Sequence, residues 1–158
     1  MFNVLIIGGG AAGLSCALVL GSAKKLAFTQ DKSIGIITHQ KTSDLQNALF
    51  NNVLGLPPGT TGASLLNDGK EQLAKLYPHV EQLDNQKVFE IIKVDDLFQV
   101  KTNKNTFQAE LVVIAVGYSN LITIKGLEDY IEPHPRAAQE KHRIWLKNTD
   151  HLIEKGLY

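Results

Sequence analysis

The chain has 158 residues, with 16 basic side chains balancing 16 acidic ones. Because the net charge is zero, no overall field attracts nucleic acid or anionic lipid, and any bound anion must be held by local geometry. The single cysteine, Cys16, excludes an internal disulfide and a redox-active cysteine pair. One cysteine fits a reducing compartment, so we expect a cytoplasmic location. This length suits one core, and residues 1–158 are predicted to form a single domain.

The first part of the chain is uncharged for twenty residues, from Val4 to Ala23. That length could also be a membrane span or a signal peptide. No Lys or Arg precedes the run, however, and three consecutive glycines, Gly8 to Gly10, interrupt it. Each glycine would weaken a continuous helix by about 1 kcal/mol relative to alanine. We therefore expect no membrane insertion.

The same run is better described as a strand, a turn and a helix. Residues Phe2–Ile7 are apolar on successive positions, which is typical of a parallel strand buried on both faces. The glycines follow, and Ala11–Ser22 is predicted to be a helix. Because this helix is apolar nearly all round, we expect it to lie between two layers. A second strand is predicted over Leu26–Gln30, ending at Asp31.

Residues 32–60 are rich in Asn, Thr, Gly and Pro and are predicted to be a long loop with a binding role. Within it, Asp44–Phe50 could form a short helical turn. A second helix is predicted over about Gly62–Leu76, where leucines recur at helical spacing. Its candidate caps are Thr60, Thr61 and Ser64.

The pattern beyond Val80 changes to short runs with a period of two, separated by turn residues. These runs predict a small antiparallel meander over about residues 87–111. Residues Leu111–Val116 are continuously apolar and β-branched, which assigns them to the buried parallel sheet. The rest of the chain is polar, with a weak helix predicted over Ala137–Leu146.

The motif that carries chemistry is Gly-x-Gly-x-x-Gly at residues 8–13, directly after a buried strand and at the start of a helix. Its first glycine allows the tight turn, its second lets a pyrophosphate approach the backbone, and its third lets helix and strand pack closely. The phosphates would lie at the helix N-terminus. Asp31 follows the last glycine by eighteen residues and is predicted to accept hydrogen bonds from an adenosine ribose.

The glycine motif also has a non-functional interpretation, and the other candidate residues give no specific signal. The glycines could form an ordinary turn that binds nothing, with Asp31 as a solvated residue. The five histidines are scattered without the spacing of a metal site, so we predict no metal. No side chain stands out as a general acid or base.

The sequence resembles the FAD-binding domain of the thioredoxin-reductase-like flavoproteins, within the pyridine-nucleotide-disulfide oxidoreductase group. The resemblance runs from Phe2 to about Tyr130 and is clearest at residues 4–15, at residues 69–78 and at residues 112–117. The last stretch is similar to the family's Ala-Thr-Gly signature, with Val116 in place of the threonine. The resemblance implies an α/β fold: a Rossmann-like three-layer FAD/NAD(P)-binding domain with a parallel central sheet and a small antiparallel meander.

The family's cofactor contacts, carried over to matching positions, give a predicted FAD site. Its glycine turn would line the pyrophosphate, Asp31 would meet the ribose, Asn52 would lie on the flavin-contacting loop, and the backbone of Val88 would pair with adenine. The residues implied for the glycine turn and the end of the last parallel strand are Gly8, Gly10, Ala11, Ala12, Gly13 and Gly117.

The departures from the family limit the chemistry. The sequence has no cysteine pair and no second Gly-x-Gly-x-x-Gly for NADPH, and Cys16 is expected to be a buried, protonated thiol. The leading interpretation is an FAD-dependent oxidoreductase reduced to its flavin domain, to which a diffusing nicotinamide or an organic substrate would bring hydride. The alternatives are an NAD(P)-binding oxidoreductase and a non-catalytic nucleotide-binding or interaction module. The redox partner stays open, neither nucleic acid nor membrane is expected as a partner, and the resemblance allows a homodimer.

The last residues, Gly156-Leu157-Tyr158, resemble the start of a strand that relatives continue into a second cofactor motif. That motif is missing from this sequence. If the 158 residues are the whole protein, we expect weak FAD binding and loose packing beyond about Tyr130. If they are a fragment, a longer chain should bind FAD firmly.

Overall fold

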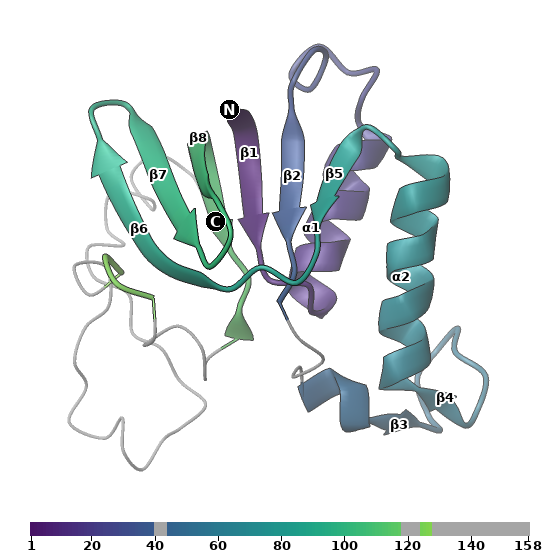
Figure 1. The fold of residues 1–158 in the computed structure, drawn as a ribbon. Coiled ribbons are helices and arrows are strands. Elements are labelled where there is room, and N and C mark those ends of the chain that lie inside the picture. The colour runs from purple at the N-terminus through teal and green to yellow at the C-terminus, as the bar shows by residue number, and fades with distance from the viewer. Residues whose placement is uncertain (40–43, 118–123, 128–158) are drawn as a thin grey trace, which may run out of the picture.

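The computed structural model describes residues 1–39, 44–117 and 124–127. Its main element is a six-stranded sheet with the strand order β5-β2-β1-β8-β7-β6 (Figure 1). In chain order these strands are β1 (Phe2–Ile7), β2 (Ile34–Ile37), β5 (Val80–Leu83), β6 (Val88–Val94), β7 (Leu97–Thr102) and β8 (Thr106–Ile114). A separate antiparallel pair consists of β3 (Leu49–Phe50) and β4 (Thr60–Thr61).

Four strands of the large sheet are parallel, and β1 lies between β2 and β8. Ile7, at the end of β1, pairs with Ile37 on one side and with Ile114 on the other. The carboxyl ends of these strands therefore meet at one edge of the sheet, which we call the carboxyl edge. Strands β6 and β7 add to β8 in antiparallel fashion. The predicted meander and parallel sheet are thus both confirmed.

The sheet buries apolar side chains on both faces because alternate residues of a strand point to opposite sides. Ile6 packs on the face covered by the helices, with Leu14, Ala17, Leu66 and Leu73. On the other face, buried side chains of β1, of β2 and of the meander strands pack together with Ile124. The residues of this cluster are Phe2, Leu5, Ile7, Ile37, Val88, Ile91, Val100, Ala109 and Ile124. The core is therefore divided by the sheet into two layers, as the uninterrupted apolar sequence of β1 predicts.

Two helices cover one face of the sheet, as Figure 1 shows. Helix α1 spans Ala11–Ser22 and α2 spans Gly62–Leu76, as predicted. The hydroxyl oxygen of Thr61 caps α2 by accepting a hydrogen bond from the Ser64 backbone N–H at 3.1 Å. A 3-10 turn, η1 (Asp44–Asn47), precedes β3. No helix in the described ranges is both long and apolar enough to cross a membrane.

Two sequence predictions about the sheet are wrong, and one strand was missed. The second strand is Ile34–Ile37 and not Leu26–Gln30, which forms turns with Leu26 and Phe28 exposed. Strand β5 was not predicted, because its central residues are polar. The stretch assigned to a meander strand and the following parallel strand form one continuous strand, β8.

The expected sandwiching of the first helix is also wrong. Its buried residues lie on one side, namely Gly13, Leu14, Ala17 and Gly21, whereas Val19 is 66% exposed. Alanine and valine on a helix do not by themselves require a second covering layer. The helix predicted at 137–146, the packing beyond Tyr130 and the residues 156–158 lie outside the described residues.

Candidate functional site

The glycine turn connects β1 to α1 at the carboxyl edge. Gly8 has φ +118°, a conformation that strongly favours glycine, and a Cβ added there would lie 2.2 Å from the backbone oxygen of Ala115. A Cβ on Gly13 would lie 1.8 Å from the backbone oxygen of Gly8. The chain therefore needs glycine at both positions for β1, α1 and the end of β8 to pack this closely.

The first turn of α1 is open to an anion. Gly10 is the N-cap residue and provides no side-chain hydrogen bond, and the first turn contains no acidic residue. Ala11 and Ala12 are exposed. By contrast, a hydroxyl caps α2 in the same chain. The first N–H groups of α1 and the positive end of its dipole are thus available for a phosphate.

Gly117 lies beside this turn, at the end of β8. The backbone N–H of Ala115 donates to the Ile7 oxygen at 2.8 Å, which continues the β1–β8 pairing up to the glycine turn. Gly117 has φ +69° and is exposed, and apart from its chain neighbours no atom of the described residues lies within 4 Å of the position of an added Cβ. Among the described residues, none fills the space beside Gly117.

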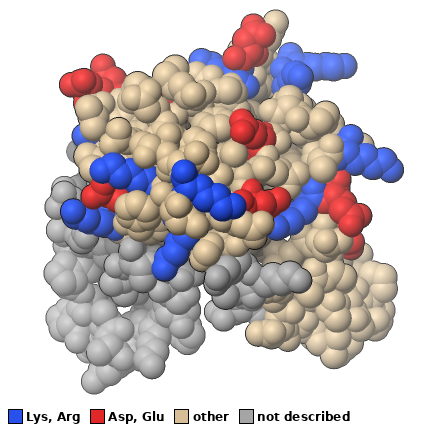
Figure 2. Space-filling model, in the orientation of Figure 1, with Lys and Arg blue, Asp and Glu red and all other residues tan. Residues whose placement is uncertain are grey.

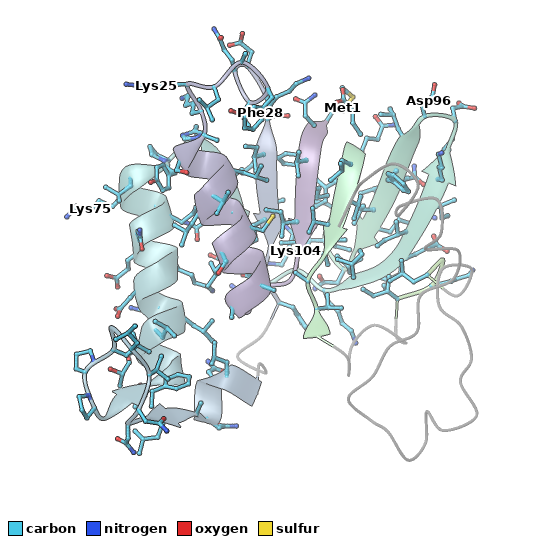
Figure 3. The ribbon with its side chains drawn as sticks, turned by 180° about the vertical axis from the view of Figure 1, so that it is seen from behind. Met1, Lys25, Phe28, Lys75, Asp96 and Lys104 are labelled. Carbon is cyan, nitrogen blue, oxygen red and sulfur yellow. The ribbon has the colours of Figure 1, made fainter. Side chains whose placement is uncertain are left out.

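Asp31 does not lie at this site. It precedes β2, and the neighbouring Ser33 accepts hydrogen bonds from the backbone N–H groups of Asn3 and Val4 at the start of β1. Asp31 and the glycine turn are therefore at opposite edges of the sheet, separated by the length of β1, about 20 Å at ~3.3 Å per residue. Figure 3 labels Met1 and Phe28 at that far edge. The predicted placement of Asp31 at the end of the second strand is wrong because that strand is Ile34–Ile37.

The strand ends next to the glycine turn carry different polar residues, which the sequence did not point out. Thr38 follows β2, is buried, and donates a hydrogen bond from its hydroxyl to the carboxylate of Asp84, which follows β5. The ammonium group of Lys70, on α2, lies 3.5 Å from the same carboxylate oxygen. The signal that could have found this group is an acidic residue directly after a short strand, had β5 been recognised.

Asn52 and Val88 lie on two other segments near the carboxyl edge. Asn52 is exposed in the turn between β3 and β4, a pair that lies beside the N-terminal end of α2 (Figure 1). Val88 begins β6, and its side chain is buried. The nearby Gln86 connects this segment to the strand ends, because its backbone N–H donates to the Thr38 oxygen at 3.0 Å. The cofactor contacts expected of Asn52 and Val88 stay predictions.

The remaining ionisable groups do not form a catalytic arrangement within the described parts of the chain. Cys16 is partly buried on α1, and desolvation raises the pKa of its thiol, so the thiol is protonated at neutral pH. Lys101 and Lys125 both contact the Glu90 carboxylate and lower its pKa. Over residues 1–39, 44–117 and 124–127, no three His, Cys, Asp or Glu side chains gather as metal ligands. Basic and acidic groups are interleaved on the face shown in Figure 2.

The chain is similar in sequence to a family of oxidoreductases. A sequence profile described as pyridine nucleotide-disulphide oxidoreductase matches residues 2–153. A ferredoxin–NADP reductase of Streptococcus agalactiae is 26% identical over 141 residues, which cover 84% of this chain and 41% of that protein. The chain thus spans about two fifths of the length of this curated relative.

Solved structures give the same assignment. A thioredoxin reductase of Streptococcus pyogenes is 28% identical, with a TM-score of 0.60 over 74% of this chain and 35% of that one. The thioredoxin reductase of T. acidophilum is 26% identical, with a TM-score of 0.59 over 82% of this chain and 40% of that one. The glycine turn, the parallel sheet and the profile match agree, and the chain belongs to the pyridine nucleotide-disulphide oxidoreductase family.

Proposed function

We propose that this chain is the FAD-binding part of a flavin-dependent oxidoreductase. The observation that carries the proposal is the glycine turn, in which side-chain atoms are excluded at Gly8 and Gly13 and the first turn of α1 has no side-chain cap. A pyrophosphate needs close backbone approach and unpaired N–H groups, and this turn offers both. The residues present therefore fit the dinucleotide.

The chain's own residues would act by binding and orientation. Gly10, Ala11, Ala12 and Gly13 would hold the pyrophosphate by backbone N–H groups, and the dipole of α1 would offset part of its charge. Gly117 would leave room for the cofactor at the end of β8. When bound, the flavin supplies the hydride and electron chemistry. The protonated thiol of Cys16 would take no part, because a neutral thiol is a poor nucleophile.

Two alternatives remain as outcomes of the test. The site could take NAD(P), and Asp31 gives no reason to prefer NAD over NADP because it lies at the far edge of the sheet. The chain could also bind a nucleotide without catalysis, which is motivated by the single cysteine. The substrate, the electron donor and the electron acceptor are left unassigned.

The test is a titration of the purified chain with FAD, followed by quenching of flavin fluorescence, together with the variant Gly10→Val. We expect saturable binding by the unmodified chain and none by Gly10→Val, because a branched side chain at the N-cap would obstruct the pyrophosphate. Ala63→Val is the matched control, since Ala63 is exposed in the first turn of α2.

Three results would contradict the proposal in different ways. Absence of FAD binding by the unmodified chain would refute it. Unchanged FAD affinity in Gly10→Val would place the pyrophosphate elsewhere. Displacement of FAD by equimolar NAD would favour the nicotinamide alternative. Turnover of NAD(P)H with an artificial acceptor, dependent on added FAD, would exclude the non-catalytic alternative.

A further inference from the structure

The ends of β2 and β5 hold a carboxylate in a fixed position. The backbone N–H of Thr38 donates to the Leu83 oxygen at 3.0 Å, and the Gln86 N–H donates to the Thr38 oxygen at 3.0 Å. The buried Thr38 hydroxyl donates to the Oδ1 atom of Asp84. Two backbone hydrogen bonds thus hold Thr38 between Leu83 and Gln86, and the hydroxyl of Thr38 orients the Asp84 carboxylate at the carboxyl edge.

This carboxylate is close to the glycine turn. A Cβ added to Gly9 would lie 2.6 Å from the Cγ2 atom of Thr38, so Thr38 separates the turn from Asp84 by the width of one side chain. A ribose attached to a pyrophosphate on the glycine turn would extend toward the end of the neighbouring strand, where an acidic residue hydrogen-bonds an unmodified ribose in dinucleotide-binding folds. In this chain the neighbouring strand, β2, ends at Ile37 and is followed by Thr38, which is not acidic.

We propose that Asp84, positioned by Thr38, is the residue that accepts hydrogen bonds from the adenosine ribose. The acidic group is then supplied by β5 and not by the strand next to the glycine turn. This inference rests on the proposed nucleotide site and names the residue that selects an unmodified ribose there. The Asp84 side chain is 50% exposed, and a carboxylate has about four acceptor positions. The hydroxyl of Thr38 occupies only part of this capacity.

The ion pair with Lys70 does not prevent the Asp84 carboxylate from accepting further hydrogen bonds. Lys70 lies 3.5 Å from Oδ1, and its side chain is 39% exposed, so the pair is screened by solvent and weak. If Asp84 served only to attach α2 to β5 through Lys70, its removal would change stability alone. If Asp84 instead accepts a hydrogen bond from the ribose, its removal would change how well the protein distinguishes ligands that differ in one ribose hydroxyl.

The experiment compares binding of ADP and 2′-deoxy-ADP by isothermal titration calorimetry in the full chain, in Asp84→Asn and in Asp96→Asn. Asp96 is the matched control because it lies in the turn between β6 and β7, at the edge of the molecule where Figure 3 also labels Met1. We expect the unmodified chain and Asp96→Asn to prefer ADP by about ten- to a hundredfold, the value of a hydrogen bond to a charged acceptor. Asp84→Asn should lose most of this preference and keep its affinity for 2′-deoxy-ADP.

The outcomes separate this inference from the proposed function. An unchanged preference in Asp84→Asn overturns the inference alone, since ADP binding would persist without the carboxylate. Tighter binding of adenosine 2′,5′-bisphosphate than of ADP by the unmodified chain also overturns it, because a carboxylate repels a 2′-phosphate. Failure of the unmodified chain to bind either ADP or FAD overturns the proposed function and the inference with it.

Thr38 is a positioning residue in this proposal, and its variants test the geometry. Thr38→Val keeps the shape of the side chain and removes the hydroxyl, so the preference for ADP should fall severalfold. Thr38→Ser restores a hydroxyl and should restore the preference. A loss of preference in both variants, with circular dichroism unchanged, would show that Thr38 acts through packing against Gly9 and not through Asp84.

Discussion

Gly13 and Gly69 are helical glycines whose replacement by alanine should change stability in opposite directions. Alanine gains about 1 kcal/mol over glycine in a helix interior. At Gly69 the added Cβ would lie 3.4 Å from the Cδ1 atom of Leu14, an ordinary contact that α2 can accept. At Gly13 it would lie 1.8 Å from the backbone oxygen of Gly8, which cannot turn away as a side chain does. The overlap should therefore cost at least the ~3 kcal/mol upper range of overpacking.

The net effect of Gly13→Ala is then a loss of at least ~2 kcal/mol, against a gain of up to ~1 kcal/mol for Gly69→Ala. For a chain of this length, 1 kcal/mol corresponds to roughly 2–4 °C in Tm. We expect Gly13→Ala to lower Tm by at least ~4 °C and Gly69→Ala to raise it by up to ~4 °C. Urea unfolding followed by circular dichroism gives the free energies. Equal stabilisation by both substitutions would refute the close packing of α1 on β1.

Three other substitutions test separate parts of the structure. Asp31→Ala should leave FAD affinity unchanged within twofold by fluorescence titration, since Asp31 lies at the far edge of the sheet; a tenfold loss would contradict that placement. Cys16→Ser should leave any flavin activity intact, and Cys16 in the unmodified chain should react with Ellman's reagent at pH 8 more slowly than free cysteine, because its raised pKa leaves less thiolate. Thr61→Ala should lower the free energy of unfolding, measured by urea curves, by about 0.5–2 kcal/mol through loss of the cap on α2.

The elements that the sequence predicts well are those whose signals are local. A β-branched run, a glycine motif and an apolar helix specify β1, the turn and α1 from neighbouring residues alone. The second strand is harder to predict because either of two short segments, residues 26–30 or residues 34–37, could form the strand beside β1. Only the pairing of Ile34 with Val4 and with Val80 decides between them, and both partners are distant in sequence.

The same limit applies to the candidate site. Strand β5 is the outermost strand of the sheet and has a neighbouring strand on one side only, so it needs only part of its surface to be apolar. Its sequence, Val-Glu-Gln-Leu, therefore carries a weak strand signal. Thr38 and Asp84 are 46 residues apart and meet only because β2 pairs with β5. The sequence could therefore predict the glycine turn, whereas the polar group beside it required the sheet order.

The long-range pairing of β1 with β8 also determines when this fold can form during protein synthesis. Phe2 pairs with Ala109, so one edge of β1 has no partner until more than a hundred residues have been made. Closing so long a loop is slow, and an apolar strand with an open edge is prone to pair with other chains in the meantime. Residues 2–37 can therefore be translated well before they are stable. A nascent chain that stops short of residue 106 would expose this edge and would be a substrate for chaperones and proteases.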